Sequence, residues 1–290
     1  MSRLWRDQLQ VFLAPDQVII AGQSRGFKPL PLFRQRAGCP SLADLTVKPL
    51  PWEWPLNQLE QLIEPLNAQI KTGSELQITL ADDFVRYGMI APQPTLANPD
   101  EMMAYAGFQM REIYGERVEE WALSVSNWDP LNGGLCAGVS LGLLAALEHF
   151  AVRHEWKLSY TEPYLAAVLD YWSGKLSSEQ LWFVLIESNR FCLVSTLAGR
   201  WRSIRNQRIV GNLEQELLSA MEQEAILTDQ PVDIAQPRRV QVFAPDTIDW
   251  QSPQAQGWYF ERLTQSEQPV PAHFPFAISP ENQASAYAQP

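Results

Sequence analysis

The sequence predicts an α/β fold with mixed sheets, divided into two lobes. Three segments, residues 9–24, 75–91 and 181–208, have the pattern of strand, turn and returning strand, and each precedes a segment whose apolar residues recur at helical spacing. Hydrophobic residues make up 46% of the 290 residues and charged residues only 19%, so the chain can bury a sizeable core. Hairpins that alternate with helices are typical of α/β and α+β architectures.

In the first third of the chain, proline and acidic residues predict where the elements turn. We expect the hairpin at 9–24 to turn at Ala14-Pro15-Asp16-Gln17, because Pro and Asp favour tight turns. Residues 26–55 contain six prolines and are expected to be largely irregular. Residues 55–70 carry Leu and Ile at helical spacing, and Pro65 should end or kink that helix. The hairpin at 75–91 should turn near Asp82 and Asp83.

The rest of the chain predicts further helices and strands in alternation. Asn98 and Pro99 are a typical N-cap and first helical residue, and this helix should end near Gly115. The unbroken apolar run 181–186 predicts a buried strand. The other expected elements are strands at 121–126, 135–139, 157–160, 191–198, 201–208 and 239–244, and helices at 141–155, 163–172 and 213–226.

Composition excludes several classes of function. The formal net charge of −11 would repel a phosphate backbone, and no basic patch strong enough to offset it is present. The cysteines, Cys39, Cys136 and Cys192, are odd in number and lack metal-ligand spacing, which fits a reducing compartment. The first residues are charged where a signal peptide is apolar, and no stretch approaches the roughly 20 apolar residues of a membrane span. We therefore expect a cytoplasmic protein.

Motifs that carry chemistry are largely missing. The sequence contains no GxxxxGK[ST], no GxGxxG after a strand, no HExxH and no GxSxG. Gly133-Gly134 fits a plain turn better than a phosphate loop, and Asp82-Asp83 fits an Asx turn better than an acid–base pair. His149 and His154 are five residues apart on a helix, so a shared metal is not expected. These observations predict no catalytic residue, no cofactor and no metal.

Four arginines alternate along one predicted strand. This pattern fits either a face that binds an acidic partner or an edge strand protected by charge, and the second interpretation is favoured. The four residues are Arg200, Arg202, Arg205 and Arg208.

The order of motifs resembles one known family. Residues 135–172, LCAGVSLGLLAALEHFAVRHEWKLSYTEPYLAAVLDYW, combine an apolar strand, a helix, a short strand ending in Glu-Pro and a second helix. This segment resembles the actin-like cytoplasmic proteins of bacterial inner-membrane assembly platforms, represented by PilM of type IV pilus assembly and the cytoplasmic part of GspL of type II secretion. Upstream, LQITLADDFVRYGMIAPQP followed by NPDEMMAYAGFQMREIYGE resembles the insertion of that family. Downstream, LWFVLIESNRFCLVSTLAGRWRSIRNQRI resembles its second-lobe hairpin.

The resemblance covers about residues 9–250 and implies an actin-like, ribonuclease H-like fold of two lobes. Residues 1–160 would form the first lobe, with an inserted hairpin and helix around 75–115, and residues 161–250 a smaller second lobe. Residues 251–290 are rich in Pro and Gln and are expected to form a flexible tail.

Departures from the family pattern fall at the nucleotide loops. An actin-like ATP site needs two hairpins whose small residues let backbone N–H groups approach the phosphates, with an Asp that positions the metal. Here Pro15 precedes Asp16 and removes a donor, Glu187 lacks a neighbouring Gly, and the loop at Asp246 lacks a Gly-Gly pair. The resemblance therefore implies an actin-like fold that has lost ATP, a pseudo-ATPase.

The expected function is that of a non-catalytic cytoplasmic scaffold, peripheral to the inner membrane through its partner. The resemblance implies that it docks the cytoplasmic tail of a membrane protein and contacts the assembly ATPase or its neighbours. We expect the docking groove between the 75–91 hairpin and the 99–114 helix, with contacts from Phe84, Val85, Arg86 and Tyr87. Alternation places Val85 and Tyr87 on one face and Phe84 and Arg86 on the other, so at most one of these pairs is free.

Two other functions stay open. A nucleotide-binding actin-superfamily enzyme, either a weak ATPase or a kinase-like protein, would need Asp16, Glu187 and Asp246 to converge on one cleft. A free-standing binding module for an unrelated cytoplasmic protein is the third candidate.

Overall fold

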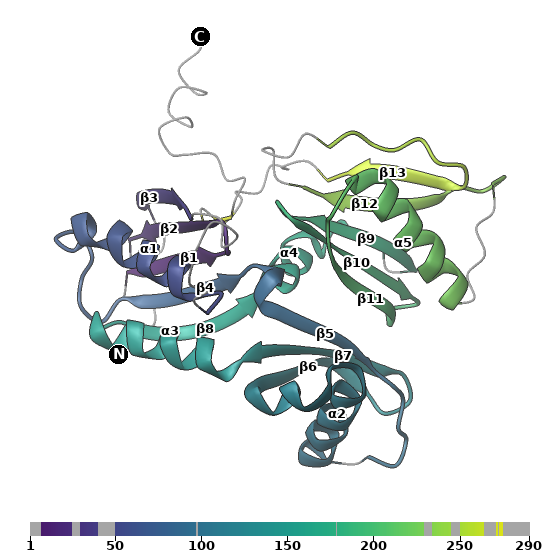
Figure 1. Ribbon diagram of the computed structural model, residues 1–290, viewed down its shortest axis with the longest axis horizontal. Coiled ribbons are helices and arrows are strands. Elements are labelled where there is room, and N and C mark those ends of the chain that lie inside the picture. The colour runs from purple at the N-terminus through teal and green to yellow at the C-terminus, as the bar shows by residue number, and fades with distance from the viewer. Residues whose placement is uncertain are drawn as a thin grey trace, which may run out of the picture. The chain divides into compact units, whose positions relative to one another are not determined.

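The computed structural model describes residues 7–24, 30–39, 50–96, 98–177, 179–228, 234–244, 250–263, 271 and 273–274. The chain forms two compact units, each assembled from separate stretches of sequence (Figure 1). Unit 1 contains residues 1–84, 142–167 and 265–290, and unit 2 contains residues 85–141 and 168–264. Across the described residues, no helix is long and apolar enough to cross a membrane.

Unit 1 is built on a five-stranded mixed sheet. The strand order is β3-β2-β1-β4-β8, with antiparallel pairing from β3 to β1 and parallel pairing from β1 to β8. The strands are β1 Gln8–Leu13, β2 Gln17–Gln23, β3 Pro31–Gly38, β4 Glu75–Leu80 and β8 Lys157–Pro163. The helices are α1 Glu53–Ile63, η3 Glu64–Leu66, η4 Asp82–Phe84, α3 Leu141–Arg153 and the start of α4 Tyr164–Trp172.

The two faces of this sheet differ in chemistry. One face presents fully buried aliphatic side chains, among them Val11 and Ile78, and α1 and α3 bury their own apolar stripes in the same core. On the opposite face, Phe12, Thr79 and Glu162 are neighbours in register. The side-chain amides of two glutamines on that face are hydrogen-bonded to each other, Gln10 to Gln77. We call this second side the polar face of unit 1.

Unit 2 contains a second five-stranded sheet with the same strand directions. Its order is β11-β10-β9-β12-β13, antiparallel from β11 to β9 and parallel from β9 to β13. The amphipathic helix α5, Leu213–Leu227, packs its buried side chains on one face, in a core with Trp182, Val184 and Val242. The strands are β9 Gln180–Ile186, β10 Arg190–Leu197, β11 Arg200–Arg208, β12 Arg238–Phe243 and β13 Trp258–Arg262.

A smaller three-stranded antiparallel sheet completes unit 2. Its order is β5-β7-β6, from β5 Val85–Ile90, β7 Gly133–Ser140 and β6 Trp121–Asp129. Helix α2, Pro99–Tyr114, and the short helix η5, Gly115–Glu120, cover one side. As the sequence predicts, the Asn98 side chain accepts a hydrogen bond from the Glu101 N–H and caps α2. A Cβ added at Gly88 in β5 would lie 2.5 Å from the Met110 sulfur, so a larger residue there would require the Met110 side chain to shift.

The two five-stranded sheets correspond position by position. Their first hairpins are closed in the same way, by Ala14 N–H donating to the Gln17 carbonyl in unit 1 and by Glu187 N–H donating to the Arg190 carbonyl in unit 2. Two residues before each of these donors lie Phe12 and Leu185, which pair with Thr79 and Phe243 respectively.

This correspondence extends to the next strand. Glu162 pairs with Thr79 in unit 1, and Leu263 follows the last pairing, Val242 with Arg262, in unit 2. The same three positions therefore hold Phe12, Thr79 and Glu162 in one sheet and Leu185, Phe243 and Leu263 in the other.

Three predictions about organisation are wrong. Residues 75–91 are not a hairpin, because β4 joins the sheet of unit 1 while β5 joins the three-stranded sheet of unit 2, with η4 between them. Within 26–55, residues 31–38 form β3 on an exposed edge, where proline is tolerated. Within 251–290, β13 adds an edge strand beside β12, since Trp258 and Phe260 are buried in the core of unit 2.

The division into lobes also differs from the predicted boundaries. In place of lobes at 1–160 and 161–250, the chain passes between the units four times, after Phe84, Leu141, Ala167 and Thr264. The inserted segment 85–141 belongs with unit 2, because β11 packs against β5 and the Asn206 side chain donates a hydrogen bond to the Val85 carbonyl.

Candidate functional site

The first hairpin of unit 1 ends in a tight turn. The Ala14 N–H donates to the Gln17 carbonyl at 3.0 Å, which leaves Pro15 and Asp16 as the two residues of the turn. Proline has no N–H, so this turn can offer a ligand the backbone N–H of Asp16 and no other. Asp16 is exposed, and its carbonyl accepts a hydrogen bond from the Cys39 N–H at 2.7 Å.

The corresponding hairpin of unit 2 is equally tight. The Glu187 N–H donates to the Arg190 carbonyl at 2.9 Å, so the turn consists of Ser188 and Asn189. Glu187 and Arg190 are both buried, and the Arg190 guanidinium donates to the Asn206 side chain. The Asn189 carbonyl accepts from the Ile209 N–H. This turn is therefore held against the neighbouring strand by side chains larger than those of a glycine-rich phosphate loop.

The third candidate loop follows β12. Ala244 is buried in the core of unit 2, and the Phe243 ring packs edge-on against Trp172 with 5.5 Å between ring centroids. Asp246 lies outside the described residues. The structure places Asp16 in unit 1 and Glu187 in unit 2.

Sequence reasoning overlooked the role of Asp82, which is fully buried. Its Oδ1 accepts a hydrogen bond from the Leu165 N–H in the first turn of α4, at 3.4 Å. A carboxylate there satisfies a backbone donor that has no partner within the helix and interacts favourably with the helix dipole. The Asx-turn interpretation pointed to a local backbone partner, whereas the partner lies 83 residues further along the chain.

The predicted partner-binding residues are mostly core. Phe84, Val85 and Tyr87 have exposed fractions of 9%, 0% and 7%, so they cannot form an open docking surface. Arg86 is exposed, and its guanidinium donates to the Val85 carbonyl. The pattern of alternation gave no sign that β11 covers this strand, since β11 lies more than a hundred residues away in sequence.

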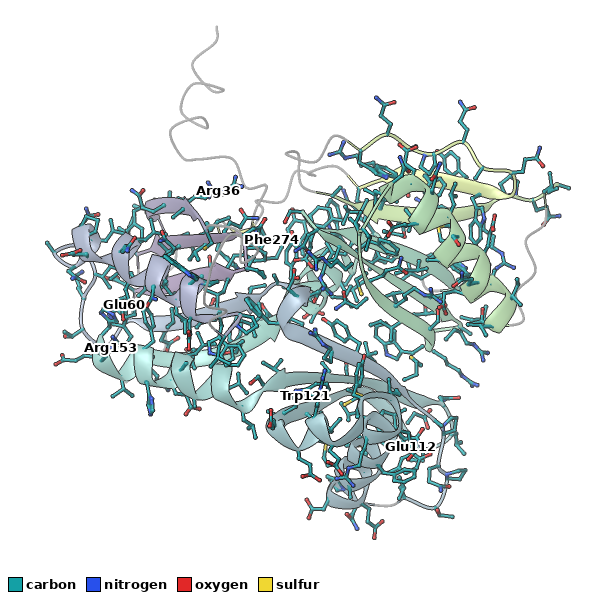
Figure 2. The ribbon with its side chains drawn as sticks, viewed as in Figure 1. Arg36, Glu60, Glu112, Trp121, Arg153 and Phe274 are labelled. Atoms are coloured by element: carbon teal, nitrogen blue, oxygen red, sulfur yellow. The ribbon has the colours of Figure 1, made fainter. Side chains whose placement is uncertain are left out.

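Unit 1 carries a groove between α1 and α3 with a volume of about 570 Å³. Its apolar part comes from both helices and from the residue before α1, and includes the half-exposed Leu50. Glu60 is one of its lining residues, and its Oε1 lies 2.9 Å from the Arg153 guanidinium (Figure 2). The Oε2 atom of Glu60 lies 2.8 Å from the His154 ring. The lining residues are Leu50, Trp52, Glu53, Leu56, Asn57, Glu60, Gly142, Ala146, His149, Phe150 and Arg153.

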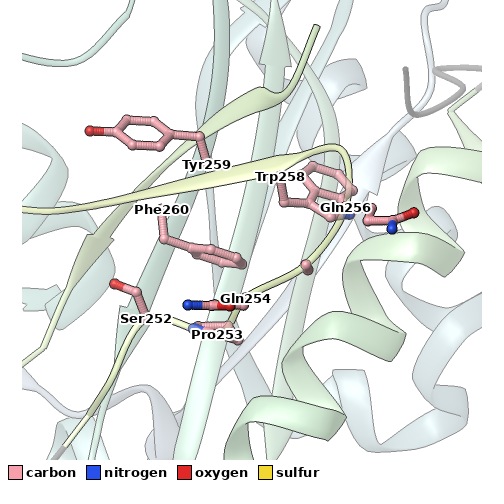
Figure 3. A pocket seen from close by; sticks show the side chains of 8 residues that line it. Ser252, Pro253, Gln254, Gln256, Trp258, Tyr259 and Phe260 are labelled. Atoms are coloured by element: carbon pink, nitrogen blue, oxygen red, sulfur yellow. The ribbon is translucent and has the colours of Figure 1, made fainter. Parts of the chain in front are cut away.

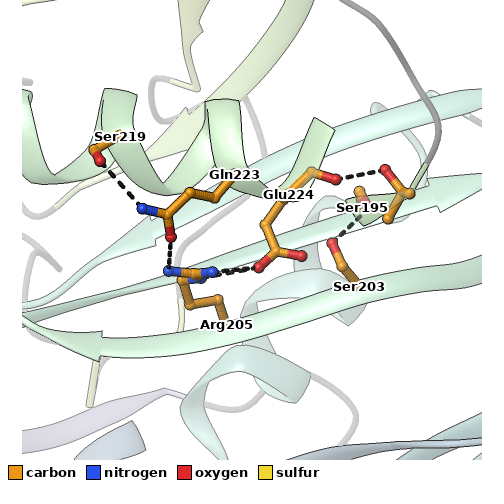
Figure 4. A network of polar contacts seen from close by, with 7 residues as sticks. Ser195, Ser203, Arg205, Ser219, Gln223 and Glu224 are labelled. Atoms are coloured by element: carbon orange, nitrogen blue, oxygen red, sulfur yellow. Dashed lines mark hydrogen bonds and ion pairs between the residues drawn. The ribbon is translucent and has the colours of Figure 1, made fainter. Parts of the chain in front are cut away.

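The arginine-rich strand β11 is the outer strand of its sheet, as the edge-strand interpretation requires. Arg205 is engaged within unit 2. Its guanidinium lies 2.8 Å from the Glu224 carboxylate, which is almost fully buried, and donates to Gln223 at 2.9 Å (Figure 4). This arginine holds α5 onto the sheet and is not a free contact for an acidic partner.

Other chemistry is sparse in the part of the chain that the structure describes. No group of three or more His, Cys, Asp or Glu side chains gathers there as a metal site would require. Burial raises the pKa of the Cys136 thiol to about 11, so it stays protonated and is a poor nucleophile at neutral pH. A second hollow, of about 630 Å³, lies beside β13 and is lined by residues 252–256 and 258–260 (Figure 3).

Comparison with solved structures identifies the fold. A protein of Bacteroides thetaiotaomicron with an actin-like ATPase fold and unknown function aligns with a TM-score of 0.53 and 9% identity, over 86% of each chain. The cytoplasmic domain of EpsL, an inner membrane component of the type II secretion system of Vibrio cholerae, aligns with a TM-score of 0.52 and 11% identity, over 89% of this chain and 90% of that one.

A third match is the PilM–PilN type IV pilus biogenesis complex, with a TM-score of 0.54, 14% identity and coverage of 84% of this chain and 82% of that one. No protein-family model and no curated protein sequence matches the chain. At these identities the likeness establishes the fold alone. The chain has an actin-like α/β fold with mixed sheets.

Proposed function

We propose that this protein is a non-catalytic, cytoplasmic scaffold of an inner-membrane assembly platform of the pilus or secretion type. The fold is shared with PilM, solved in complex with PilN, and with the cytoplasmic domain of EpsL, an inner membrane component. In this proposal the chain retains the actin-like fold for its surfaces and docks the cytoplasmic tail of a membrane partner.

The observation that carries the proposal is the geometry of the two hairpin turns. A phosphate loop needs several backbone N–H groups that converge on the ligand, usually with glycine to allow a close approach. The turn at Pro15-Asp16 supplies a single N–H, and the turn at Ser188-Asn189 is flanked by the buried side chains of Glu187 and Arg190. The geometry of both turns therefore supports the proposal that this fold no longer binds ATP.

The groove between α1 and α3 is the surface we assign to the partner tail. Two glutamates of α1, Glu53 and Glu60, line the groove, and Glu60 is paired there with Arg153 of α3. Cytoplasmic segments next to membrane spans carry an excess of Lys and Arg. A tail with apolar residues for the groove and a basic residue for Glu53 is therefore complementary to this site.

Titration with ATP and magnesium tests the loss of nucleotide. A ligand at a hundred times its Kd stabilises the folded state by about 2.7 kcal/mol, which raises the Tm measurably. We expect no change in Tm at millimolar ATP with or without magnesium. A magnesium-dependent increase would contradict the proposal and favour the alternative, a nucleotide-binding actin-superfamily enzyme.

Peptide binding tests the groove. The probe is a fluorescent amphipathic peptide built from Leu and Lys, compared with a Leu and Glu peptide of the same pattern. Ala146 lines the groove and Ala145 is exposed outside it, so Ala146→Trp should weaken binding of the Leu/Lys peptide about tenfold while Ala145→Trp leaves it unchanged. Equal binding by both variants would show that the peptide is held elsewhere. Glu53→Lys changes a glutamate of the groove and should weaken binding of the Leu/Lys peptide, whereas Glu148→Lys, an exposed residue outside the lining, is its matched control.

A further inference from the structure

Two residues near the C-terminus, His273 and Phe274, are buried on the polar face of unit 1. Their exposed fractions are 5% and 1%. The Phe274 ring packs edge-on against Tyr164, with 5.3 Å between centroids, and Tyr164 packs in the same way against Phe12. The Arg34 guanidinium donates to the Phe274 carbonyl at 3.3 Å, so both the backbone and the side chain of Phe274 are recognised.

His273 is held through one ring nitrogen. Its Nε2 lies 3.0 Å from the Thr79 hydroxyl, and that hydroxyl lies 3.5 Å from the Glu162 carboxylate. Its Nδ1 is buried and has no hydrogen-bond partner among the described residues. Burial lowers the pKa of the imidazole to about 3, because a charged ring would lose its hydration, and the nearby Arg34 acts in the same direction. The contact therefore includes an uncompensated polar group.

The corresponding face in unit 2 is sealed differently. Leu185, Phe243 and Leu263 occupy the positions of Phe12, Thr79 and Glu162, and they are buried. The Phe243 ring packs against Trp172, which comes from a regular helix, α4, that directly precedes the sheet in sequence. At these three positions the strand topology therefore accepts apolar side chains, although Gln241 on the same face is buried and donates to the Lys175 carbonyl. The topology itself does not require the hydroxyl, carboxylate and imidazole found in unit 1.

From this difference we infer that the polar face of unit 1 is a binding site for a short peptide segment carrying an aromatic side chain, and that His273 and Phe274 are its built-in occupant. In this site the aromatic ring of the bound segment packs against Tyr164, and the carbonyl of that aromatic residue accepts a hydrogen bond from Arg34. The residue before it in the segment is hydrogen-bonded to Thr79. A partner segment with an aromatic residue after a hydrogen-bonding one displaces the chain's own segment. This inference does not depend on the scaffold function.

Binding of the chain's own sequence in trans tests the site. The probe is a fluorescein-labelled peptide of residues 268–277, QPVPAHFPFA, titrated into the full-length chain and into the full-length Phe274→Ala variant. An intact segment that leaves the site open about one part in a hundred lowers the apparent affinity about 100-fold. We therefore expect the variant to bind the peptide and the natural chain to bind it far more weakly. The control peptide carries Ala in place of Phe274 and keeps Phe276.

The binding experiment has one result that supports the site and one that contradicts it. Binding to Phe274→Ala that requires Phe274 in the peptide supports the site, and absence of binding to a folded Phe274→Ala variant overturns it. If this variant does not fold, hydrogen exchange of the natural chain decides. The inference predicts that the His273 and Phe274 amides exchange faster than those of β1, and exchange of both only through global unfolding overturns it. A dimer in which two copies exchange this segment would also overturn the inference, because the site would then bind a second copy of this chain and not a segment of a different partner.

Discussion

The two five-stranded sheets share one topology and differ most on a single face. In both, the face under the helices is filled by aliphatic side chains, Val11 and Ile78 in unit 1 and Val184 and Val242 in unit 2. On the other face, the pair next to the hairpin is Leu185 with Phe243 in unit 2 but Phe12 with Thr79 in unit 1. A repeated topology thus tolerates either chemistry, so the polar version is a property of this sequence and not of the fold.

The largest effect on stability should come from disrupting the apolar cluster on this face of the unit 2 sheet. Phe243→Ala removes a ring that is 2% exposed and packs against Trp172, which should lower the free energy of unfolding by about 3–5 kcal/mol. Urea unfolding followed by circular dichroism measures this loss.

Tyr259→Ala is the matched control in the same sheet, because Tyr259 is 60% exposed and its loss should stay within about 0.5 kcal/mol. A loss below about 1 kcal/mol for Phe243→Ala would mean that this face of unit 2 is not a sealed core.

A second prediction converts the polar face of unit 1 toward the apolar one. Thr79→Val leaves both nitrogens of His273 without a partner and should cost about 1–3 kcal/mol. Adding His273→Leu removes the stranded imidazole, so the double variant should unfold within about 1 kcal/mol of the natural chain. The double-mutant cycle from urea unfolding gives the coupling. Additive losses in the two single variants would show that the two side chains do not act as a pair.

Local signals predicted most elements, while pairings between distant segments were missed. Pro15 and Asp16 fix the first turn, and Asn98 and Pro99 fix the start of α2, because these effects act within a few residues. Strands β4 and β5 look like a hairpin because only four residues separate them, yet each pairs with strands elsewhere in the chain. Which sheet a strand joins depends on contacts that its own periodicity does not encode.

The candidate sites also depend on contacts between distant segments, which local sequence patterns do not predict. The turns without glycine were visible in the sequence, since they consist of consecutive residues. His273 was assigned to a flexible tail because Pro, Gln and Ser surround it, yet it meets Thr79 from 194 positions away. Asp82 was treated as a turn residue, although it bonds the first turn of α4. Burial of a lone polar residue is decided by such distant partners.

The smallest predicted effect is a pH dependence confined to unit 1. The ordinary imidazole pKa of 6.5 falls to about 3 for His273 in place, so above pH 6.5 both the bound and released segments are neutral and docking is independent of pH. As the pH falls below 6.5, the released imidazole gains a proton that the buried one does not, and docking weakens about tenfold per unit, or about 1.4 kcal/mol.

The charged groups around His273 should modulate this dependence without reversing it. Arg34 disfavours a second positive charge at the imidazole, whereas Glu162, reached through Thr79, is an acidic group on the same face, as is Glu75 further along β4. Hydrogen exchange of the His273 and Phe274 amides, corrected for intrinsic rates, should rise about fivefold more between pH 6.5 and 5.5 than in His273→Leu, because half of the released imidazole is already charged at pH 6.5. Unit 2 has no imidazole at the corresponding described positions, so exchange at Phe243 should show no such increase. An equal rise in both sheets would trace the pH dependence to global unfolding rather than to release of the segment.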